Sequence, residues 1–401
     1  MVSVQDRIRR LLAERGVARA HSWLDAQDAH TVALQRAIVA IPAPTFGESE
    51  RARFVEDRMR GIGLVDVRTD AAGNVHGRYG VGDRAGVVVA AHLDTVFPAG
   101  TNCAVLTNGD GALTRIAAPG IGDNARGLTA MLRVAEACVA CDVRTPSPLT
   151  FVATVGEEGE GDLRGARALF DQPGFRPAAF IALDGPGIER VVHRALGGRR
   201  LRATFRGPGG HSWAAFGIAN AAHAVGLATA AIQELRLPAS QRAVASVVRL
   251  GGGTALNTIP AAAWLELDLR AESDASLEDV HAAVTQACAR AVESVNRRRA
   301  SGSAPLTLEL TPLGQRPSGA TDEDHPLVQA ALEATHALGF TTQLAAASTD
   351  ANVAMARGVP AIALGAGGRG GDAHLPTEWY ENTDGSAGIV RALLVALAAG
   401  E

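Results

Sequence analysis

The chain has 401 residues, 47% of them hydrophobic and 20% charged, which is the balance of a globular protein with two domains or one large domain carrying an insertion. A formal net charge of −4 gives no indication of nucleic acid or an anionic membrane as a partner. All 38 basic residues are arginine, so the absence of lysine excludes pyridoxal-phosphate, Schiff-base and P-loop chemistry, each of which needs a lysine amine.

Residues 1–30 are expected to form polar, amphipathic helices rather than a secretory signal, because they contain no apolar core segment. No uninterrupted apolar run is long enough to cross a bilayer, and we therefore expect a cytoplasmic protein. The four cysteines are too few for a disulfide framework. Cys138 and Cys141 form a C-x-x-C late in a helical stretch without a second pair nearby, which favours buried packing over metal or redox chemistry.

Helices are predicted over residues 31–41 and 47–62, followed by strands near 65–70 and 75–80. Four later segments share one design, in which an apolar strand ends in polar residues or glycine: GVVVAAHLDTV, PLTFVATVGEE, AAFIALDG and VPAIALGAG. Such runs are typical of buried strands whose carboxyl ends carry function. We therefore expect an α/β domain with a mixed sheet covered by helices and a site at the strand ends.

Residues 195–313 are expected to form a separate α+β domain inserted into the first. Alternating strands and two helices, near 217–236 and 275–298, follow one another in βαββαβ order. The catalytic domain is then split into a first part, 1–194, with a helical extension over its first thirty residues, and a second part, 314–401.

His92 and Asp94 stand at the end of the first of the four apolar strands. They lie two residues apart and so face the same side of a strand. A carboxylate in that position can fix the tautomer and orientation of a histidine that binds metal. Taken alone, the H-x-D pattern is equally that of an ordinary polar strand terminus.

Further carboxylates follow the other strands. Asp123 in GIGDNARG precedes a helix, where an N-cap is the alternative interpretation. Glu157 and Glu158 follow PLTFVATVG, where adjacent acids are otherwise a solvated turn. In such a pair one carboxylate can bind metal while the other is a general base for a metal-bound water. Asp184 ends the strand AAFIAL, and His374 follows a glycine-rich loop after the last apolar strand.

Metal-competent side chains thus gather at predicted strand ends or in adjacent loops. They are His92, Asp123, Glu158, Asp184 and His374. Two histidines with carboxylates suit zinc or related ions such as cobalt or manganese, whereas structural zinc would favour cysteines. We therefore expect a metal centre at the carboxyl edge of the sheet.

The motifs that carry these residues also resemble a known family. They are AHLDTV, GIGDNARG, GEEGEGDLRG, ALDG, GPGGHSW, GGGTALNTIP, STDAN and DAHLPTEWY. Together they are similar to the co-catalytic dizinc metallopeptidases that include glutamate carboxypeptidases, aminoacylases, succinyl-diaminopimelate desuccinylases and tripeptide aminopeptidases. The resemblance covers residues 31–401. It implies a zinc-exopeptidase-like catalytic domain, an inserted lid and dimerisation domain, and a homodimer.

The resemblance also implies a role for each residue of the centre. His92 and Asp184 would bind one of two divalent ions, with zinc preferred, and Glu158 and His374 would bind the other. Asp123 would bridge the two ions, and the peptide bond that follows it would be cis. Asp94 would orient His92, and Glu157 would take a proton from the bridging water and deliver it to the leaving amine.

In the inserted domain, the resemblance implies that His211 stabilises the oxyanion. The alternative interpretation is a histidine in a turn without a catalytic role. Asn257 and Arg270 would bind the substrate, and a surface role is the alternative interpretation of Arg270. Backbone amides of the loop Gly365–Gly371, represented by Gly367, would approach the substrate. Asp350 lies in a matching motif without an assigned role.

The expected function is metal-dependent hydrolysis of a peptide bond in small peptides, by an exopeptidase of tripeptidase or carboxypeptidase type. The main alternative is an N-acyl amino acid amidohydrolase, which would need a free α-carboxylate on its substrate. A second alternative is a non-catalytic peptide-binding relative, which is disfavoured because the ligands and Glu157 are all present. Neither nucleic acid nor membrane is expected as a partner.

Overall fold

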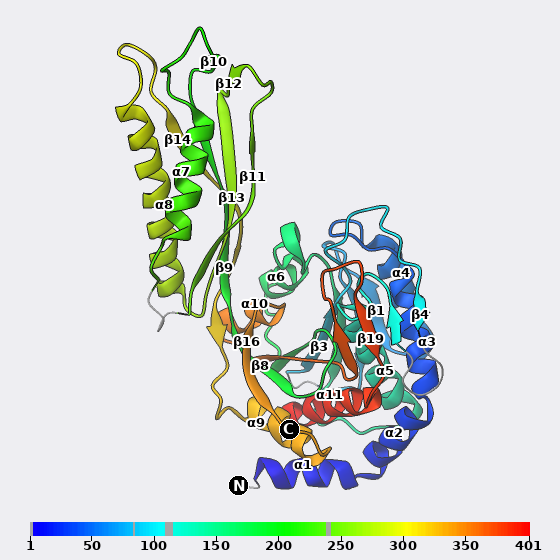
Figure 1. The fold of residues 1–401 in the computed structure, drawn as a ribbon. Helices are drawn as coiled ribbons and strands as arrows, with labels where there is room; N and C mark the ends of the chain where they lie inside the picture. Colours follow the sequence, from blue (N-terminus) through cyan, green and yellow to red (C-terminus); the bar gives the residue numbers. More distant parts are fainter. Residues whose placement is uncertain (1–2, 83–84, 109–114, 238–241) are drawn as a thin grey trace. The chain divides into compact units, whose positions relative to one another are not determined.

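The computed structural model describes most of the chain, in the segments 3–82, 85–108, 115–237 and 242–401. It divides into two compact units, and both chain termini belong to the first (Figure 1). The first unit consists of Met1–Ala195 and Ala320–Glu401, and the second is Leu196–Gly319. The second crossing lies later than the expected residue 313, because strand β14, Thr307–Arg316, remains paired within the sheet of the second unit.

The first unit contains a nine-stranded mixed sheet with the order β1-β2-β6-β3-β7-β17-β8-β15, and β16 pairs with β8. Its central strands β6, β3, β7 and β17 are parallel, while β2 and β8 run antiparallel to their neighbours in this centre. The strands are β1 Val65–Thr69, β2 Val75–Tyr79, β3 Val87–His92, β6 Leu149–Thr154, β7 Ala179–Leu183, β8 Arg190–Ala195, β15 Gly319–Ala320, β16 Gln343–Ala347 and β17 Ala361–Leu364. The expected mixed sheet is confirmed.

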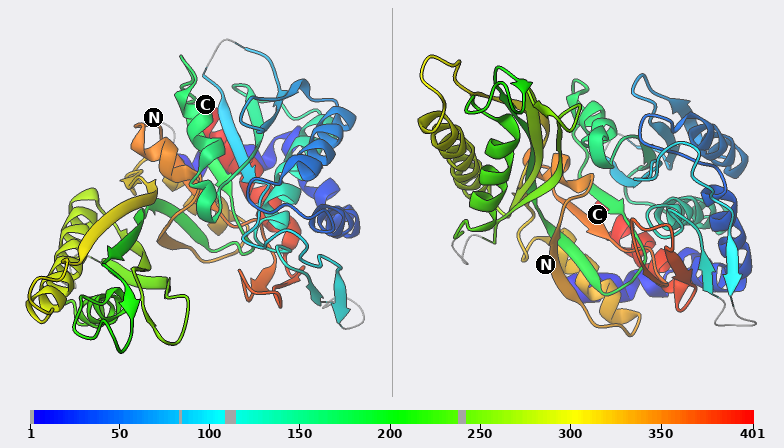
Figure 2. Two further views of the ribbon diagram at one scale, coloured as in Figure 1. Left: turned by 90° about the horizontal axis from the view of Figure 1, so that it is seen from above. Right: turned by 45° about the horizontal axis from the view of Figure 1, so that its top comes forward.

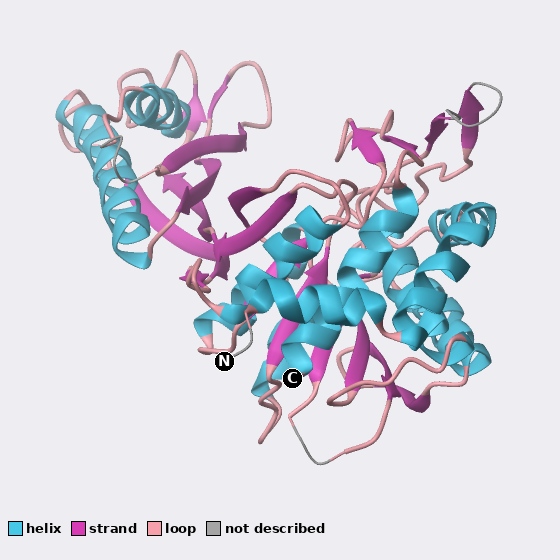
Figure 3. Ribbon diagram, turned by 90° about the horizontal axis from the view of Figure 1, so that it is seen from below, coloured by secondary structure: helices cyan, strands magenta, loops and turns pink. Residues whose placement is uncertain are grey.

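The central strands are buried on both faces, which explains their continuous apolar sequences. In β3, Val87 and Val89 belong to one hydrophobic core, and Val88 and Ala90 belong to another on the opposite face. Helices cover both faces and flank the strands in Figure 3. They are α5 Ala125–Ala140 and α11 Gly385–Gly400 against the first core, and α6 Arg164–Asp171 and α10 Ala351–Ala356 against the second.

The remaining helices of this unit pack around the first core, where α1 contacts α9 and α11 and α2 contacts α5. They are α1 Val4–Ala13, α2 Arg15–Ala26, α3 Asp28–Val39, α4 Ser49–Ile62 and α9 Pro326–Ala337, with the short 3-10 helix η1 at Gly159–Gly161. The N-terminal segment forms α1 and α2 and contributes Leu11, Val17 and Leu24 to the core. Among the described residues, no helix combines the length and the apolar character needed to cross a membrane.

A second, small sheet of four short strands was not expected from the sequence. Its order is β18-β19-β5-β4, with β4 Leu106–Asn108, β5 Arg115–Ala117, β18 Arg369–Gly371 and β19 Trp379–Glu381. It joins the segment before α5 to the glycine-rich loop and the segment that follows His374. The two chain segments that carry Asp123 and His374 are therefore tied together by this sheet.

The second unit is an antiparallel sheet, β11-β13-β9-β14, with its own core between the sheet and two helices (Figures 1 and 2). The helices are α7 Ala221–Gln233 and α8 Asp274–Arg297, and the strands are β9 Gly197–Arg206, β11 Val244–Gly252 and β13 Ala262–Ala271 beside β14. A separate strand pair, β10 Gly210–His211 with β12 Thr258–Ile259, completes the unit. The expected βαββαβ order is present, with β10 and β12 as additions.

Candidate metal centre

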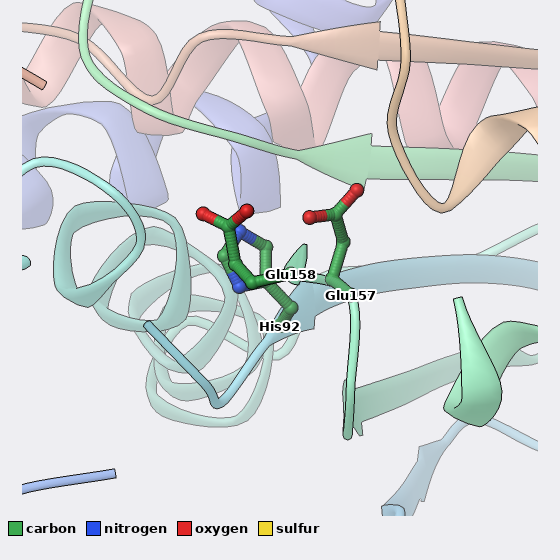
Figure 4. A group of neighbouring side chains, drawn as sticks. All are labelled: His92, Glu157 and Glu158. Atoms are coloured by element: carbon green, nitrogen blue, oxygen red, sulfur yellow. The ribbon is translucent and has the colours of Figure 1, made fainter. Parts of the chain in front are cut away.

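The parallel strands of the first unit bring the predicted ligands to one edge of the sheet. His92 is the last residue of β3, Glu157 and Glu158 follow β6, and Asp184 follows β7. Because β3 lies between β6 and β7, these side chains emerge side by side. Figure 4 shows His92, Glu157 and Glu158 projecting to the same side.

Asp123 lies between the two histidines. Its Oδ1 atom is 3.0 Å from His92 Nε2, and its Oδ2 atom is 3.1 Å from His374 Nε2. His92 Nε2 is also 3.6 Å from Asp184 Oδ1, and His374 Nε2 is 3.1 Å from Glu158 Oε1. One carboxylate therefore faces two imidazoles, each of which has a second carboxylate beside it.

These side chains form groups with the spacing of a metal site, in which candidate ligand atoms lie within 4.8 Å of one another. The groups are His92, Asp123 and Asp184; Asp123, Glu158 and His374; and His92, Glu157 and Glu158. The first two share Asp123. Oxygen and imidazole nitrogen are the donors that zinc, cobalt and manganese accept.

The bridging position itself fits a metal ion. Asp123 Oδ1 is buried and, among the described residues, accepts no hydrogen bond, although His92 Nε2 is 3.0 Å away. A buried carboxylate oxygen that faces a ring nitrogen without a directed hydrogen bond is suited to share a cation with it. The peptide bond Asp123–Asn124 is cis, as the family resemblance implies.

Asp94 supports the centre in two ways. Its backbone carbonyl lies 3.0 Å from His92 Nδ1, which leaves Nε2 directed at Asp123. Its carboxylate accepts the backbone N–H groups of Glu157 and Glu158, each at 2.9 Å, and the hydroxyl of Thr45, also at 2.9 Å. The carboxylate thus fixes the segment that carries the acidic pair, and its Oδ1 atom also lies 3.6 Å from His92 Nδ1.

Glu378 holds the turn before Asp123, and the sequence alone did not single it out. Its carboxylate accepts the N–H groups of Gly120, Gly122 and Asp123 at 2.9, 2.8 and 2.7 Å. The side chain is buried, and burial raises the pKa of Glu378 to about 7. Only the four-stranded sheet, which places β19 beside β5, brings this distant residue to the turn.

Hydrogen bonds and burial shift the protonation of the centre. Hydrogen bonds to Asp123 and Glu158 raise the pKa of His374 to about 10. Burial alone would raise the pKa of Asp123, but the adjacent imidazoles of His374 and His92 outweigh it and hold that pKa low. Burial raises the pKa of Glu158. Because an imidazole must lose its proton from the nitrogen that binds metal, metal binding at this centre is expected to release protons.

Asp350 lies behind the centre, fully enclosed at the N-terminus of α10. It accepts the hydroxyl of Thr154, the residue paired with His92 across β3 and β6, at 2.5 Å. Its second oxygen is buried and accepts no hydrogen bond from the described residues. Burial raises the pKa of Asp350 to about 6. This residue is a partly satisfied buried acid close to the ligands, without being one of them.

Two of the predicted substrate residues lie together in the second unit. His211 in β10 pairs with Thr258, and Asn257 immediately precedes that residue. Both side chains are exposed. The Nδ1 atom of His211 accepts the N–H groups of Trp213 and Ala214, at 3.2 and 3.3 Å, which leaves its Nε2 atom for a further partner.

Arg270 and Gly367 have local partners. Arg270 lies at the end of β13 remote from β12, and its Nε atom donates to Asp268 at 3.0 Å. Gly367 has a φ of 83°, and its N–H donates to the carbonyl of Gly187 at 2.9 Å. A Cβ atom at Gly367 would lie 2.4 Å from the carbonyl oxygen of Gly385. Close packing against α11 therefore explains this glycine, and its amide is already occupied.

Solved structures of similar fold cover nearly the whole chain. A tripeptidase from Staphylococcus aureus matches with a TM-score of 0.75 and 20% identity, covering 92% of this chain and 98% of its own. A di-peptidase from Saccharomyces cerevisiae matches with a TM-score of 0.74 and 15% identity, covering 96% and 99%. An amidase of the hydantoinase/carbamoylase family from Burkholderia vietnamiensis matches with a TM-score of 0.70 and 19% identity, covering 95% and 97%.

These identities are low enough that the structural likeness establishes the fold alone. No curated protein sequence matches the chain. The sequence model of Peptidase family M20/M25/M40 matches residues 88–398, a span that includes every predicted ligand. The chain therefore belongs to this peptidase family, whose members are hydrolases of peptide or amide bonds.

Proposed function

We propose that the protein is a dinuclear metal-dependent exopeptidase that cleaves small peptides. The observation that carries this proposal is the pair of three-residue groups that share Asp123. His92, Asp123 and Asp184 would hold one divalent ion, and Asp123, Glu158 and His374 would hold the second. Zinc suits this donor set, and cobalt or manganese are the alternatives. The metal dependence of the family agrees with such a centre.

Two bound ions would supply a water of lowered pKa and would polarise the scissile carbonyl. The protein's own contribution is to hold and move protons beside that water. Glu157 is buried and belongs to the cluster with His92 and Glu158, so its carboxylate is positioned to accept the water's proton. The same carboxyl group would then protonate the leaving amine. Asp94 fixes the backbone of both glutamates during these transfers.

The second unit would supply the remaining groups. We assign His211 to oxyanion stabilisation and Asn257 to substrate contact, because both are exposed and adjacent on the strand pair β10–β12. Arg270 is a weaker candidate for substrate binding, since Asp268 already engages its guanidinium. The protein would form a homodimer through its second unit. The substrate partner would be a small peptide.

An N-acyl amino acid amidohydrolase is the second candidate. The observation that favours it is the fold similarity to a hydantoinase/carbamoylase amidase, which is close to that of the peptidases. Both reactions break an amide bond by the same proton transfers, so the metal centre does not distinguish them. A panel that compares free tripeptides with N-acetylated amino acids separates the two, because an aminopeptidase needs the free amine and an acylase does not.

The central test is removal and return of metal. Dialysis against a chelator should abolish hydrolysis of the best substrate in the panel, and added Zn²⁺, Co²⁺ or Mn²⁺ should restore it with about two ions per chain, as expected for a two-metal site. Metal content measured by mass spectrometry gives the stoichiometry. Full activity in protein shown to contain no metal would refute the proposal.

A further inference from the structure

A cavity of about 370 Å³ adjoins the metal centre entirely within the first unit. Its lining residues include Asp123, Asp184, Arg190, Ser348 and Thr349. The volume is at the lower end of the range of about 300–1,000 Å³ for small-molecule sites. It has room for a short segment of a substrate whose amide bond lies at the metal ligands.

Arg190 is the only cationic side chain among the described residues that line this cavity. It is the first residue of β8, and Val192, two positions further on the same face of the strand, also lines the cavity. The backbone of Arg190 is fixed, since its carbonyl accepts Nη1 of the buried Arg391 at 3.4 Å and β8 pairs with β16 through Gln343.

The guanidinium of Arg190 forms no ion pair or hydrogen bond with any described residue. Other arginines of the chain show the contrast, because Arg270 donates to Asp268 and Arg164 donates to Glu48. A cation that lines an otherwise acidic cavity, yet is not paired with its carboxylates, has its donors available to a ligand. A planar guanidinium with several N–H groups is matched to a carboxylate in two-bonded geometry.

We propose that Arg190 is a specificity-determining residue that binds a carboxylate of the substrate in this cavity. The inference rests on the proposed hydrolase function, which places the scissile amide at the metal ligands beside it. The hydroxyl groups of Ser348 and Thr349 add polar partners on the wall of the same cavity. The substrate class is thereby a short peptide or N-acyl amino acid with a free carboxylate close to the cleaved bond.

The test compares acids with their neutral amides in metal-loaded, full-length protein. The ligands are Ala-Ala-Ala and its C-terminal carboxamide, and N-acetyl-L-alanine and its carboxamide. Affinity is measured by calorimetry in the Glu157→Gln background, where turnover is slowed, and hydrolysis is measured with Glu157 present. The variants are Arg190→Gln and Arg190→Lys, with Arg194→Gln as the matched control, because Arg194 is an exposed arginine of β8 that does not line the cavity.

At least one acid should bind more tightly than its amide. Arg190→Gln should weaken the binding of that acid by about tenfold or more, while the affinity for the amide should change by less than about twofold. Arg190→Lys should recover part of the preference, since a point charge lacks the two-bonded geometry. Arg194→Gln should change the affinity for neither the acid nor the amide. Equal weakening of acid and amide, or no acid preference in the unsubstituted protein, would overturn the inference.

The two proposals fail in different ways. Hydrolysis of acids and amides at equal rates would leave the metal-dependent hydrolase intact and remove the role of Arg190. Binding of an acid that depends on Arg190, in a protein that cleaves none of the panel with any of the three metals, would leave the anion subsite and remove the proposed reaction.

Discussion

Glu378 illustrates how one side chain can set the geometry of the candidate metal centre through the turn that carries a ligand. Its two oxygens accept three N–H groups in the turn that presents Asp123. A charge-assisted hydrogen bond to a backbone amide is about twice as strong as a neutral one. The carboxylate therefore holds the turn in place, and its effect on function should pass through the metal ligand that the turn carries.

We expect Glu378→Gln to weaken metal binding by about tenfold or more, because the amide group has only one acceptor oxygen for three donors. Titration with Co²⁺, followed by its absorption spectrum, measures both affinity and coordination geometry. Glu381→Gln is the control, since Glu381 is the last residue of β19, the strand that directly follows Glu378, and pairs with the exposed Arg115. An unchanged cobalt spectrum and affinity in Glu378→Gln would show that the turn keeps its shape unaided.

Asp350 provides a prediction for the pH dependence of stability. Its pKa of about 6 in the folded protein exceeds the ordinary value of 3.8, mainly through burial. Between these values the folded state binds more protons than the unfolded state, so this residue makes the protein less stable as pH rises through that window. The penalty is complete above pH 6 and is on the order of 1–3 kcal/mol, at 1.36 kcal/mol for each pKa unit.

Asp350→Asn removes the charge while its carbonyl oxygen can still accept the Thr154 hydroxyl. Relative to Asp350→Asn, the unsubstituted protein should therefore lose stability between pH 4 and pH 7. Urea unfolding in the presence of chelator, at several pH values, gives the two free energies of unfolding. If the difference in free energy of unfolding between the two proteins stayed constant with pH, Asp350 would have the same charge in the folded and unfolded states across this range.

At the scale of elements, the sequence predicted the amphipathic helices through their periodicity and the central strands through their long apolar runs. The runs in β3, β6, β7 and β17 are buried on both faces and were recognised, and α4, α7 and α8 lie within a few residues of their expected bounds. The family expected from the motifs at the strand ends is also confirmed. Those motifs work because one short segment contains both the strand and its ligand.

Other elements could not be predicted because their sequences carry no such signal. Strands β5 and β18 have only three residues each, RIA and RGG, and are defined by their partners in the small sheet. Nothing in the local sequence connects Glu378 with Gly120, because the small sheet alone brings the two residues together. The sequence around Arg190 likewise does not distinguish it from the other arginines, because only the fold places it in the cavity.

Buried arginines connect the helices to the loops that carry the site. Arg51 of α4 donates to the carbonyls of Ile41 and Leu93, and Leu93 lies between His92 and Asp94. Arg126 of α5 donates to the carbonyls of Ala366 and Gly385. These side chains are inaccessible to solvent, so the cost of burying each guanidinium is offset in part by the backbone carbonyls to which it donates.

We expect Arg126→Met to lower the free energy of unfolding by about 2–4 kcal/mol, because two buried carbonyls lose their donor although the volume is nearly kept. Arg9→Met, at an exposed position of α1, should change stability by less than about 0.5 kcal/mol. Urea denaturation of both variants tests the difference. If the two variants proved equally stable, the guanidinium of Arg126 would not be what secures the glycine-rich loop.

At the scale of the whole molecule, all five predicted ligands belong to the first unit, and the second unit has a separate hydrophobic core. The two crossings between the units are adjacent in the sheet, because β8, which ends at Ala195, neighbours β15 at Gly319–Ala320. Gly198 likewise pairs with Arg316 across β9 and β14. A short linker can therefore replace the entire second unit without stretching the first.

We expect a chain in which two to four glycine or serine residues, roughly the length of a tight turn, join Ala195 to Ala320 to fold and to bind metal with unchanged stoichiometry. Hydrolysis should fall to a small fraction of that of the full chain, because His211 and Asn257 are absent. Circular dichroism and metal analysis report on the fold and the centre, and the substrate panel reports on activity. Loss of the metal together with the second unit would show that the centre depends on residues outside the first unit, whereas retained activity would remove His211 and Asn257 from the mechanism.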